Sequence, residues 1–323
     1  MSSDARRFVS SFSEQESIDQ VFRANDKQLR SNRNGNLFLQ VELSDRSGSI
    51  AARMWNAKQR DYDSFDNGDY VRVEGTTQLF QGAMQMIANS VRKAEGTEVD
   101  ESDFQALTSP QIDAMANRLA AILRAMNNPH LRNLADAFLL DDRFMGKFTQ
   151  APAGIKNHHA YHGGLLEHVV NLMEIVLLVA PRYPQLDAEL LLVGAFLHDA
   201  GKVDELGYEK GLTYTDQGQL LGHIVLAISL LDAKIREAEQ LAGEPLPEEL
   251  VLRLKHVIVS HHGQYEFGSP RLPMTLEAIA LHQLDNLDAK IHNFHLLMQD
   301  DANTDSHWTQ FHHNLGRKLY KGP

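Results

Sequence analysis

The first part of the chain alternates apolar and polar residues with a period of two. Between residues 36 and 88, the runs 37–43 and 50–54 place an aliphatic side chain at every second position. This is the pattern of strands with one buried face. Turn-forming sequences separate the runs, and Gly75 and Gly82 bracket a further hairpin. We predict five short strands that close into a small barrel of the OB-fold type.

From Gln111 onward the apolar residues recur at intervals of three and four, which is the helical period. Thr108-Ser109-Pro110 has the composition of a helix start. No strand pattern of comparable strength appears, so we expect an all-α bundle that ends in a short helix from Trp308 to Pro323. The further helices are predicted near residues 130–150, 163–180, 187–199, 218–241, 247–261 and 275–298.

These two patterns predict a multidomain β + α protein. Residues 1–93 would form the barrel domain and residues 111–323 the helical domain. The stretch 94–110 is acidic, small and polar, which is typical of a linker.

The composition narrows the chemistry. The chain has 323 residues, 43% of them hydrophobic, and no cysteine, which excludes disulfides and thiolate metal sites. The 16 histidines are the natural candidates for metal ligands. We find neither an unbroken apolar run of membrane-spanning length nor an apolar signal segment at the N-terminus. We therefore expect a cytoplasmic protein without a membrane partner.

The charge is unevenly divided. Of the formal charge of -12, residues 1–93 contribute almost nothing, with 13 Lys/Arg against 12 Asp/Glu, whereas residues 94–323 hold 18 against 31. A polyanion would therefore have to be met by the barrel rather than by the acidic second part.

The predicted outer face of the barrel combines aromatic rings with arginines. Such a face binds single-stranded nucleic acid, because bases stack on rings while guanidinium groups contact phosphates. The alternative is that Phe38 and Trp55 pack under a loop or against the second domain. The residues predicted on this face are Phe38, Gln40, Arg53, Trp55, Tyr70 and Arg72.

Histidines and aspartates interrupt five apolar segments of the second part. A carboxylate at the end of an apolar helix, as in His198-Asp199, is costly unless a cation compensates it. Ligands from several helices predict a divalent-metal site inside a helical bundle. His168, His198, Asp199 and Asp285 would supply four ligands, while His223, His261 and His262 would hold a second ion or contact a substrate phosphate.

A mixed nitrogen and oxygen shell suits manganese, iron, cobalt or nickel better than calcium. Such a metal activates water for attack on phosphorus, and Lys202 would neutralise charge that develops on a phosphoryl oxygen. The implied chemistry is phosphoester hydrolysis, with His198, Asp199 and Lys202 as the catalytic residues. Gly201 would end the helix and let Asp199 and Lys202 turn into one cavity.

The order H…HD…D, extended as H-D-x-G-K and followed by H-H, resembles the HD-domain phosphohydrolase superfamily. That resemblance implies the ligand roles of His168, His198, Asp199 and Asp285. The wider context resembles the YhaM-like 3′-to-5′ exoribonucleases, and it implies an N-terminal OB-fold, manganese dependence and a single-stranded RNA substrate, with DNA in some members. This context comprises residues 158–168, His261-His262-Gly263 with Gly268-Ser269-Pro270, Thr275–Ala278, 284–290 and the Trp308-Thr309 tail.

Two other enzyme classes stay open as alternatives. The cyclic-dinucleotide phosphodiesterase branch shares H-D-x-G-K and H-H, but its G-Y-P element is replaced here by Gly268-Ser269-Pro270, and Gly164 stands where that branch has a glutamate. Hydrolases of free nucleotides share the four core ligands alone. A third alternative is a non-catalytic single-strand binding protein with a structural metal.

Several further residues have two interpretations. We expect His158, His159 and His162, which precede the first ligand helix, to contact the substrate, and the alternative is a surface cluster. Asp288, one turn after Asp285, either supports that ligand or caps solvent-facing groups. The sequence leaves the assembly state open, including a homo-oligomer.

Overall fold

The computed structural model describes residues 6–32, 34–80, 83–104, 106–154, 161–207, 213–299, 301, 303 and 306–322. The chain divides into two compact units. One includes Met1–Ala106 and Phe294–Pro323, and the other includes Leu107–Tyr208 and Thr213–Asn293.

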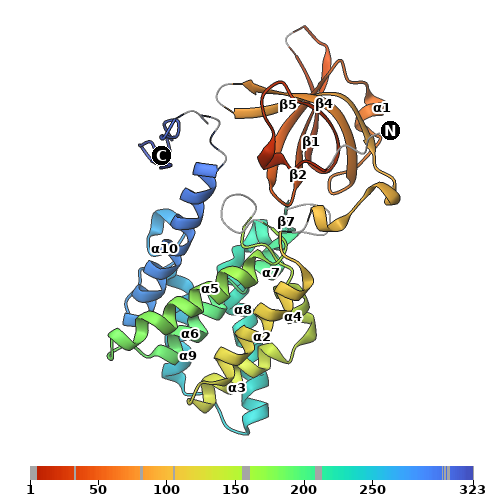
Figure 1. Ribbon diagram of the computed structural model, residues 1–323. Helices are drawn as coiled ribbons and strands as arrows, with labels where there is room; N and C mark the ends of the chain where they lie inside the picture. The colour runs from red at the N-terminus through yellow and green to blue at the C-terminus, as the bar shows by residue number, and fades with distance from the viewer. Residues whose placement is uncertain are drawn as a thin grey trace. The chain divides into compact units, whose positions relative to one another are not determined.

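The first unit contains a closed five-stranded barrel, drawn in red to orange in Figure 1. The strand order is β1-β2-β3-β5-β4, in which β1 closes on β4 antiparallel and β3 pairs with β5 in parallel. This confirms the predicted OB-fold barrel. The strands are β1 (Ser17–Ser31), β2 (Leu37–Asp45), β3 (Gly48–Trp55), β4 (Tyr70–Phe80) and β5 (Ala83–Lys93), with α1 (Gln59–Tyr62) between β3 and β4 and a short 3-10 turn, η1 (Val9–Ser11), before β1.

The alternation in the sequence corresponds to the two faces of each strand. Leu39, Val41 and Leu43 of β2 point into the barrel and are buried, while the residues between them are half-exposed. Strand β1 is long enough to pair with β4 in its first half and with β2 in its second, and a register shift between Asn25 and Gln28 separates the two halves. The barrel therefore closes around one apolar core.

The segment after the last strand is attached to the barrel. It contains two 3-10 turns, η2 (Gly96–Glu98) and η3 (Glu101–Asp103). The Phe104 ring lies 4.7 Å from the Tyr70 ring, and Glu98 pairs with Arg72 at 3.0 Å. Residues of the predicted linker, 94–110, therefore have partners on the barrel.

The second unit is helical, as predicted, and α2 begins after Thr108. The Thr108 and Gln111 side chains cap that helix through a capping box. A small hairpin, β6 (Leu206–Gly207) with β7 (Thr213–Tyr214), is the strand content that we had not expected. The helices are α2 (Ser109–Arg124), α3 (Pro129–Leu139), α4 (Asp142–Phe148), α5 (Gly164–Val179), α6 (Ala188–Leu197), α7 (Lys202–Glu205), α8 (Asp216–Ala242), α9 (Glu248–Ser260) and α10 (Leu276–Gln299), with the 3-10 turns η4 (Ala180–Arg182) and η5 (Tyr265–Phe267).

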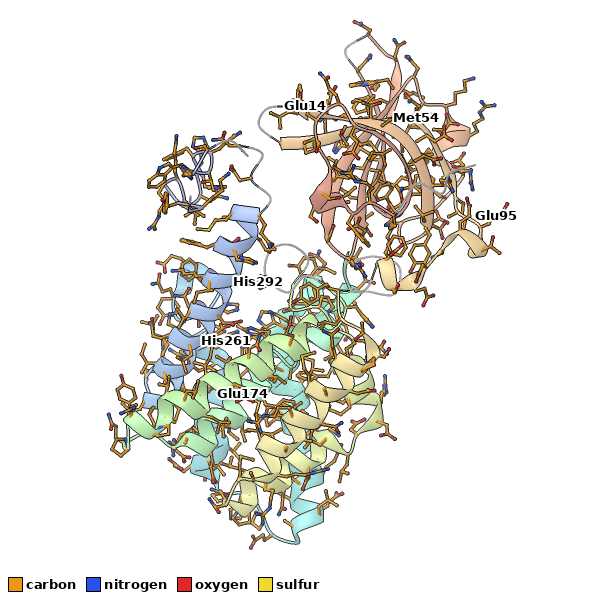
Figure 2. The ribbon with its side chains drawn as sticks, viewed as in Figure 1. Glu14, Met54, Glu95, Glu174, His261 and His292 are labelled. Carbon is orange, nitrogen blue, oxygen red and sulfur yellow. The ribbon has the colours of Figure 1, made fainter. Side chains whose placement is uncertain are left out.

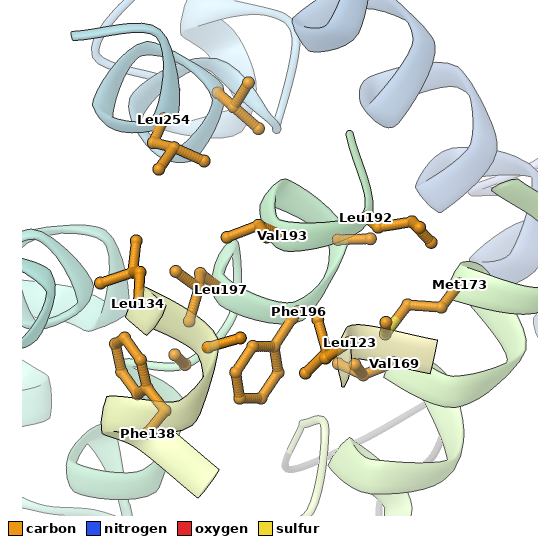
Figure 3. Close-up of a cluster of buried hydrophobic side chains, with 14 of the residues drawn as sticks. Leu123, Leu134, Phe138, Val169, Met173, Leu192, Val193, Phe196, Leu197 and Leu254 are labelled. Carbon is orange, nitrogen blue, oxygen red and sulfur yellow. The ribbon is translucent and has the colours of Figure 1, made fainter. Parts of the chain in front are cut away.

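Helix α6 runs through the centre of this unit. Each of its residues from Leu190 to Leu197 is buried, which explains its unbroken apolar sequence. Figure 3 shows the Phe196 ring among Leu123, Leu197 and Phe138, and the Phe138 and Phe196 rings meet edge to face at 5.6 Å. A helix so enclosed can deliver the residues at its end to the interior of the bundle.

Two segments, Gly164–Arg182 and Asp216–Ala242, are long and apolar enough to cross a membrane by length and composition. The first contains α5, which packs against α2 and α6 and buries seven apolar side chains in the core. The second contains α8, which packs against α3 and α7. The buried apolar residues of α5 therefore belong to the bundle core, as do Ile224, Ala227, Leu231, Ile235 and Ala238 of α8.

The prediction of a last helix from Trp308 was wrong. The described residues of the tail, 306–322, form two antiparallel bridges instead, between Trp308 and Tyr320 and between His312 and Arg317. Trp308, Phe311, Leu315 and Leu319 recur at helical intervals, but Gly316 adopts φ +63° at the turn between the two bridged arms, so the chain reverses there instead of continuing as a helix.

Candidate metal centre and nucleic-acid interface

Three helices bring the first group of polar side chains together. His168 lies on α5, His198 directly follows α6, and Asp285 lies on α10. The His168 Nε2 atom is 3.4 Å from the His198 Nε2 atom and 3.2 Å from the Asp285 Oδ1 atom. Both imidazoles are fully buried. The three side chains offer donor atoms within 4.8 Å of one another, which is the spacing of a metal site.

A second group lies beside the first and comprises His223 of α8 with His261 and His262, which follow α9. Their ligand atoms also lie within 4.8 Å of one another. Figure 2 labels His261, which lies within the helical unit. Burial, followed by the charges of His198 and other neighbours, lowers the pKa of His261 well below its ordinary value. The imidazole is therefore neutral at physiological pH, as metal binding requires.

Asp199 lies between the two groups. Its Oδ2 atom is 3.3 Å from His198 Nε2, and its Oδ1 atom is 3.5 Å from His223 Nε2 and 3.7 Å from His261 Nε2. Burial raises the pKa of this carboxyl, but the charges of Lys202 and His198 hold it well below the usual range. Asp199 is therefore an ionised carboxylate that faces both groups.

Lys202 holds its ammonium group beside that carboxylate. The Nζ atom donates to Asp199 Oδ2 at 2.6 Å and to the Ala153 carbonyl at 2.7 Å. Burial lowers the pKa of Lys202, but the charge of Asp199 outweighs it and the pKa is raised. A permanent positive charge thus accompanies the histidines.

Every imidazole of the two groups has an acceptor on Nδ1. A carbonyl cannot donate, so an imidazole bonded to one carries its proton on Nδ1 and keeps the lone pair on Nε2. Nε2 is the atom that faces the cluster. The acceptors are the Ala195 carbonyl for His198 at 2.9 Å, the Ile258 carbonyl for His261 at 2.7 Å, the Phe267 carbonyl for His262 at 2.7 Å, and the carboxylates of Asp288 for His168 at 2.8 Å and Glu205 for His223 at 3.2 Å.

His168 has carboxylates on both nitrogens. Burial acts to lower its pKa, but hydrogen bonds to Asp285 and Asp288 raise the pKa to about 9, so a metal ion would have to displace the Nε2 proton of this ring. Asp288, which the sequence offered as a support for Asp285 or as a cap of solvent-facing groups, accepts a hydrogen bond from the imidazole of His168. One turn of α10 places both carboxylates against the same ring.

Glu205 is the residue of this cluster that the sequence reasoning missed. It ends α7, is buried, and accepts from both the backbone N–H of His223 at 3.0 Å and its ring. Gly222 makes this contact possible because its φ of +74° breaks α8 just before His223. The signal in the sequence was weak, because Glu205 is one of two adjacent carboxylates between Val203 and Leu206.

Gly201 is needed because a side chain would not fit there, and not because of its backbone angle. Its φ of -67° is helical, which differs from the expected helix-ending conformation. A Cβ atom at this position would lie 2.0 Å from the His223 carbonyl oxygen and 2.7 Å from the Ala227 nitrogen. Glycine therefore lets the H-D-x-G-K turn approach the backbone of α8, which brings Asp199 within reach of His223.

The side chains of this cluster fit a divalent cation. Asp199 Oδ1, His223 Nε2 and His261 Nε2 are buried atoms without a hydrogen-bond partner among the described residues. Leaving such atoms unpaired is costly, and a cation would satisfy all three. The donors are imidazole nitrogens and carboxylate oxygens, which suit a first-row transition metal.

The structure thus brings together all seven residues that the sequence singled out as metal ligands. Of the three histidines predicted to contact substrate, the structure describes one. His162 is partly exposed, and its Nδ1 atom lies 3.3 Å from the Gln150 carbonyl oxygen. His158 and His159 lie outside the described residues.

Part of the predicted barrel face forms a contiguous surface. Phe38 of β2 faces Trp55 of β3, with ring centroids 5.2 Å apart, and Gln40 faces Arg53 in the same pair of strands. Arg53 lies over the Phe80 ring at 5.6 Å. Trp55 is 45% exposed, so this surface offers an aromatic ring and a guanidinium group to solvent.

The other two predicted residues of the face lie elsewhere on the barrel. Tyr70 packs on Phe104, and Arg72 is held by Asp19 at 2.7 Å and by Glu98 at 3.0 Å. Both lie near the start of β4, whereas Phe80, whose ring contacts Arg53, is the last residue of that strand. Tyr70 and Arg72 therefore do not extend the surface around Trp55.

The fold and this cluster define a class of protein in which a nucleic-acid-binding barrel precedes a helical metal-binding domain. The family model described as an OB-fold nucleic acid binding domain matches residues 22–94, and the HD domain model matches residues 165–290.

Whole proteins of this class resemble the chain over most of its length. The 3'-5' exoribonuclease YhaM of Bacillus velezensis is 37% identical over 290 residues, which cover 89% of this chain and 88% of that protein. The 3'-5' exoribonuclease YhaM of Bacillus subtilis is 37% identical over 279 residues, or 85% of this chain and 86% of that protein. The chain therefore belongs to the YhaM family.

Proposed function

We propose that this protein is a metal-dependent exoribonuclease that shortens single-stranded RNA from its 3′ end. The observation that carries the proposal is the buried cluster of five imidazoles and two carboxylates in a chain whose relatives are named 3'-5' exoribonucleases. An HD domain implies dependence on a divalent metal. We propose manganese as that metal, with one or two ions, because nitrogen and oxygen donors favour it over calcium.

The ligand roles follow the two groups. His168, His198 and Asp285 would hold one ion, His223, His261 and His262 would hold the other, and Asp199 faces both. A divalent cation bound here supplies a Lewis acid for attack on phosphorus. Glu205 and Asp288 hold two of the imidazoles in the orientation that this binding needs.

Lys202 and Asp199 have distinct tasks in this proposal. Lys202 is anchored on two oxygens, so its charge is fixed where a phosphoryl oxygen gains negative charge in the transition state. Asp199 stays ionised and keeps that ammonium charged. The Nδ1 atom of His198 lies 2.9 Å from the Ala195 carbonyl oxygen, so its Nε2 atom is directed to the centre.

The barrel would grip the RNA strand. The exposed Trp55 ring, the adjacent Phe38 ring and the Arg53 guanidinium group provide stacking and charge without reading sequence. We propose that single-stranded DNA is an alternative substrate and that His162 contacts the strand. We also propose that the protein acts in the cytoplasm, where RNA is abundant.

A 5′-labelled single-stranded RNA tests the activity. Incubation with the protein and Mn²⁺ should give a ladder of progressively shorter labelled products, and EDTA should suppress it. Cleavage confined to internal positions, or no cleavage, would refute the exonuclease. Parallel reactions with nucleoside triphosphates and cyclic dinucleotides identify a nucleotide hydrolase if these are turned over while RNA is not.

The strand-binding surface has a separate test. Replacing Arg53 by Gln should reduce the slope of log affinity against log salt by about one phosphate contact. Arg92→Gln is the matched control, because Arg92 is exposed on the same barrel but paired with Glu98 at 2.7 Å. Equal slopes for the two variants would remove Arg53 from the interface.

A further inference from the structure

The loop that follows His262 carries two aromatic side chains in solvent. Tyr265 is 58% exposed and Phe267 is 64% exposed, and both belong to the short turn η5. Neither ring has an aromatic partner among the described residues. A single exposed apolar residue is ordinary, but two large rings within three residues of chain leave much apolar surface uncovered.

This loop is fixed to the catalytic cluster. The Phe267 carbonyl accepts the Nδ1–H of His262 at 2.7 Å, and the His262 ring is 4.3 Å from the His261 ring. The Gly268 N–H returns to the Tyr265 carbonyl at 2.9 Å, and Gly268 adopts the φ of +81° that this turn requires. The rings are therefore presented from a backbone that also orients a ligand of the second group.

The far end of the loop is anchored as well. Ser269 is buried, and its hydroxyl donates to the Arg271 carbonyl at 2.8 Å, while its backbone N–H donates to the Gln264 carbonyl at 3.2 Å. The Arg271 N–H donates to the Val259 carbonyl of α9 at 3.3 Å. Because both ends of the turn are held by hydrogen bonds, its backbone conformation keeps the two rings exposed.

We propose that Tyr265 and Phe267 form a stacking site for a nucleobase that flanks the scissile phosphodiester. The inference rests on the proposed function, since it takes the adjoining cluster as the place where the phosphodiester is cut. An aromatic ring offers its face to any base, so the site binds purines and pyrimidines without reading their edges. It holds the end of the strand at the centre, whereas the barrel surface around Trp55 holds the strand elsewhere.

The test compares an intact RNA with RNAs that carry an abasic residue at the terminal or at the penultimate 3′ position. The native protein should remove the end of at least one abasic strand more slowly than that of the intact strand, by on the order of tenfold in kcat/KM. The Tyr265→Ala/Phe267→Ala double variant should cleave the intact strand with a similar loss and should no longer distinguish it from the abasic strand. The Tyr265→Phe/Phe267→Tyr variant, which keeps both rings, should restore the discrimination.

Tyr183→Ala is the matched control. Tyr183 is also an exposed aromatic residue of the helical unit. It follows the far end of α5, roughly 17 Å along the helix axis from the position of His168. It should therefore leave both rates unchanged.

The outcomes separate the two levels of the proposal. If the native protein shortens RNA and the double variant keeps the native preference for an intact end, the stacking site is refuted while the exonuclease stands. If the native protein shortens none of the strands, the proposed function fails, and this inference fails with it.

Discussion

At the scale of single residues, the cluster depends on groups that do not face the metal position. Asp288 and Glu205 each hold one imidazole by Nδ1, and backbone carbonyls hold the other three. Orientation of this kind makes Nε2 the coordinating atom before any ion arrives.

Replacing Asp288 by Asn should therefore weaken metal binding without removing a ligand. The amide keeps an acceptor near His168 but loses the charge, so we expect a loss of about 10- to 100-fold in metal affinity and activity. Titration of the metal-free protein with Mn²⁺ measures it. Asp113→Asn, an exposed change on α2 of the same unit, is the control. An unchanged dissociation constant for Asp288→Asn would show that its contact with His168 has no part in binding.

Gly201 is expected to be intolerant of a side chain. A methyl group there would collide with the His223 carbonyl, so Gly201→Ala should lower the free energy of unfolding by about 1–3 kcal/mol and reduce activity. Gly146→Ala is the contrasting change, because Gly146 lies in α4 with open space around it. It should raise stability by about 0.5–1 kcal/mol. Urea unfolding of the two variants gives the comparison, and equal effects would contradict the close approach.

At the scale of elements, the fold was predictable where one sequence period determines one face. Strands β2 and β3 and the helices of the bundle appear where alternation and the 3.6-residue repeat placed them, whereas β1 (Ser17–Ser31) precedes the alternating region and Gly75 lies inside β4 rather than at its boundary. The prediction of a helix from Trp308 failed because the turn at Gly316, and not the spacing of the apolar residues, determines the structure of the tail.

The metal-ligand residues could also be predicted from the spacing of apolar residues. Each ligand interrupts an apolar segment, so its burial could be inferred from its neighbours. Tyr70 and Arg72 could not be separated from Trp55, because the order of strands in a barrel is not written in the alternation. Glu205 was missed because its partner, His223, lies 18 residues away across a kink at Gly222.

A carboxylate near the start of α10 should make the stability of the fold depend on pH. The buried Glu277 near the start of α10 accepts the backbone N–H of Asp187 at 3.0 Å and pairs with Arg253 at 3.1 Å. Burial acts to raise the pKa of Glu277, but these partners lower it below the ordinary 4.5. A depressed pKa stabilises the fold above the unfolded value, and this contribution is lost as the pH falls through the folded value.

We therefore expect Glu277→Gln to destabilise the protein near neutral pH and to differ less from the native protein well below pH 4.5. Urea unfolding at both pH values measures the difference. Glu248→Gln, an exposed change on α9, should show no such convergence. A Glu277→Gln effect that is constant with pH would mean that the charge of Glu277 does not contribute.

At the scale of the whole molecule, the residues proposed for strand binding and those proposed for hydrolysis belong to different units. Phe38, Arg53 and Trp55 belong to the barrel, while the imidazoles and carboxylates belong to the helical unit. The two activities should therefore be lost separately.

Asp199→Ala should abolish cleavage and leave RNA affinity nearly unchanged. Trp55→Ala should weaken RNA affinity by about 10-fold and keep the rate at saturating RNA, since one stacking ring is removed. Filter binding and single-turnover cleavage of one labelled strand give both quantities. Loss of affinity in Asp199→Ala would show that the helical unit, rather than the barrel, provides most of the grip.

The anchored Nδ1 atoms have a consequence for how the enzyme is loaded. Because each Nδ1 atom is already hydrogen-bonded, we expect an ion to bind without any ring turning over, so that binding would cost little rearrangement. A rigid cage of this kind gives modest preference among ions of similar size. We therefore expect the supply of metal in the cell, more than the cage itself, to decide which of these similar ions is bound.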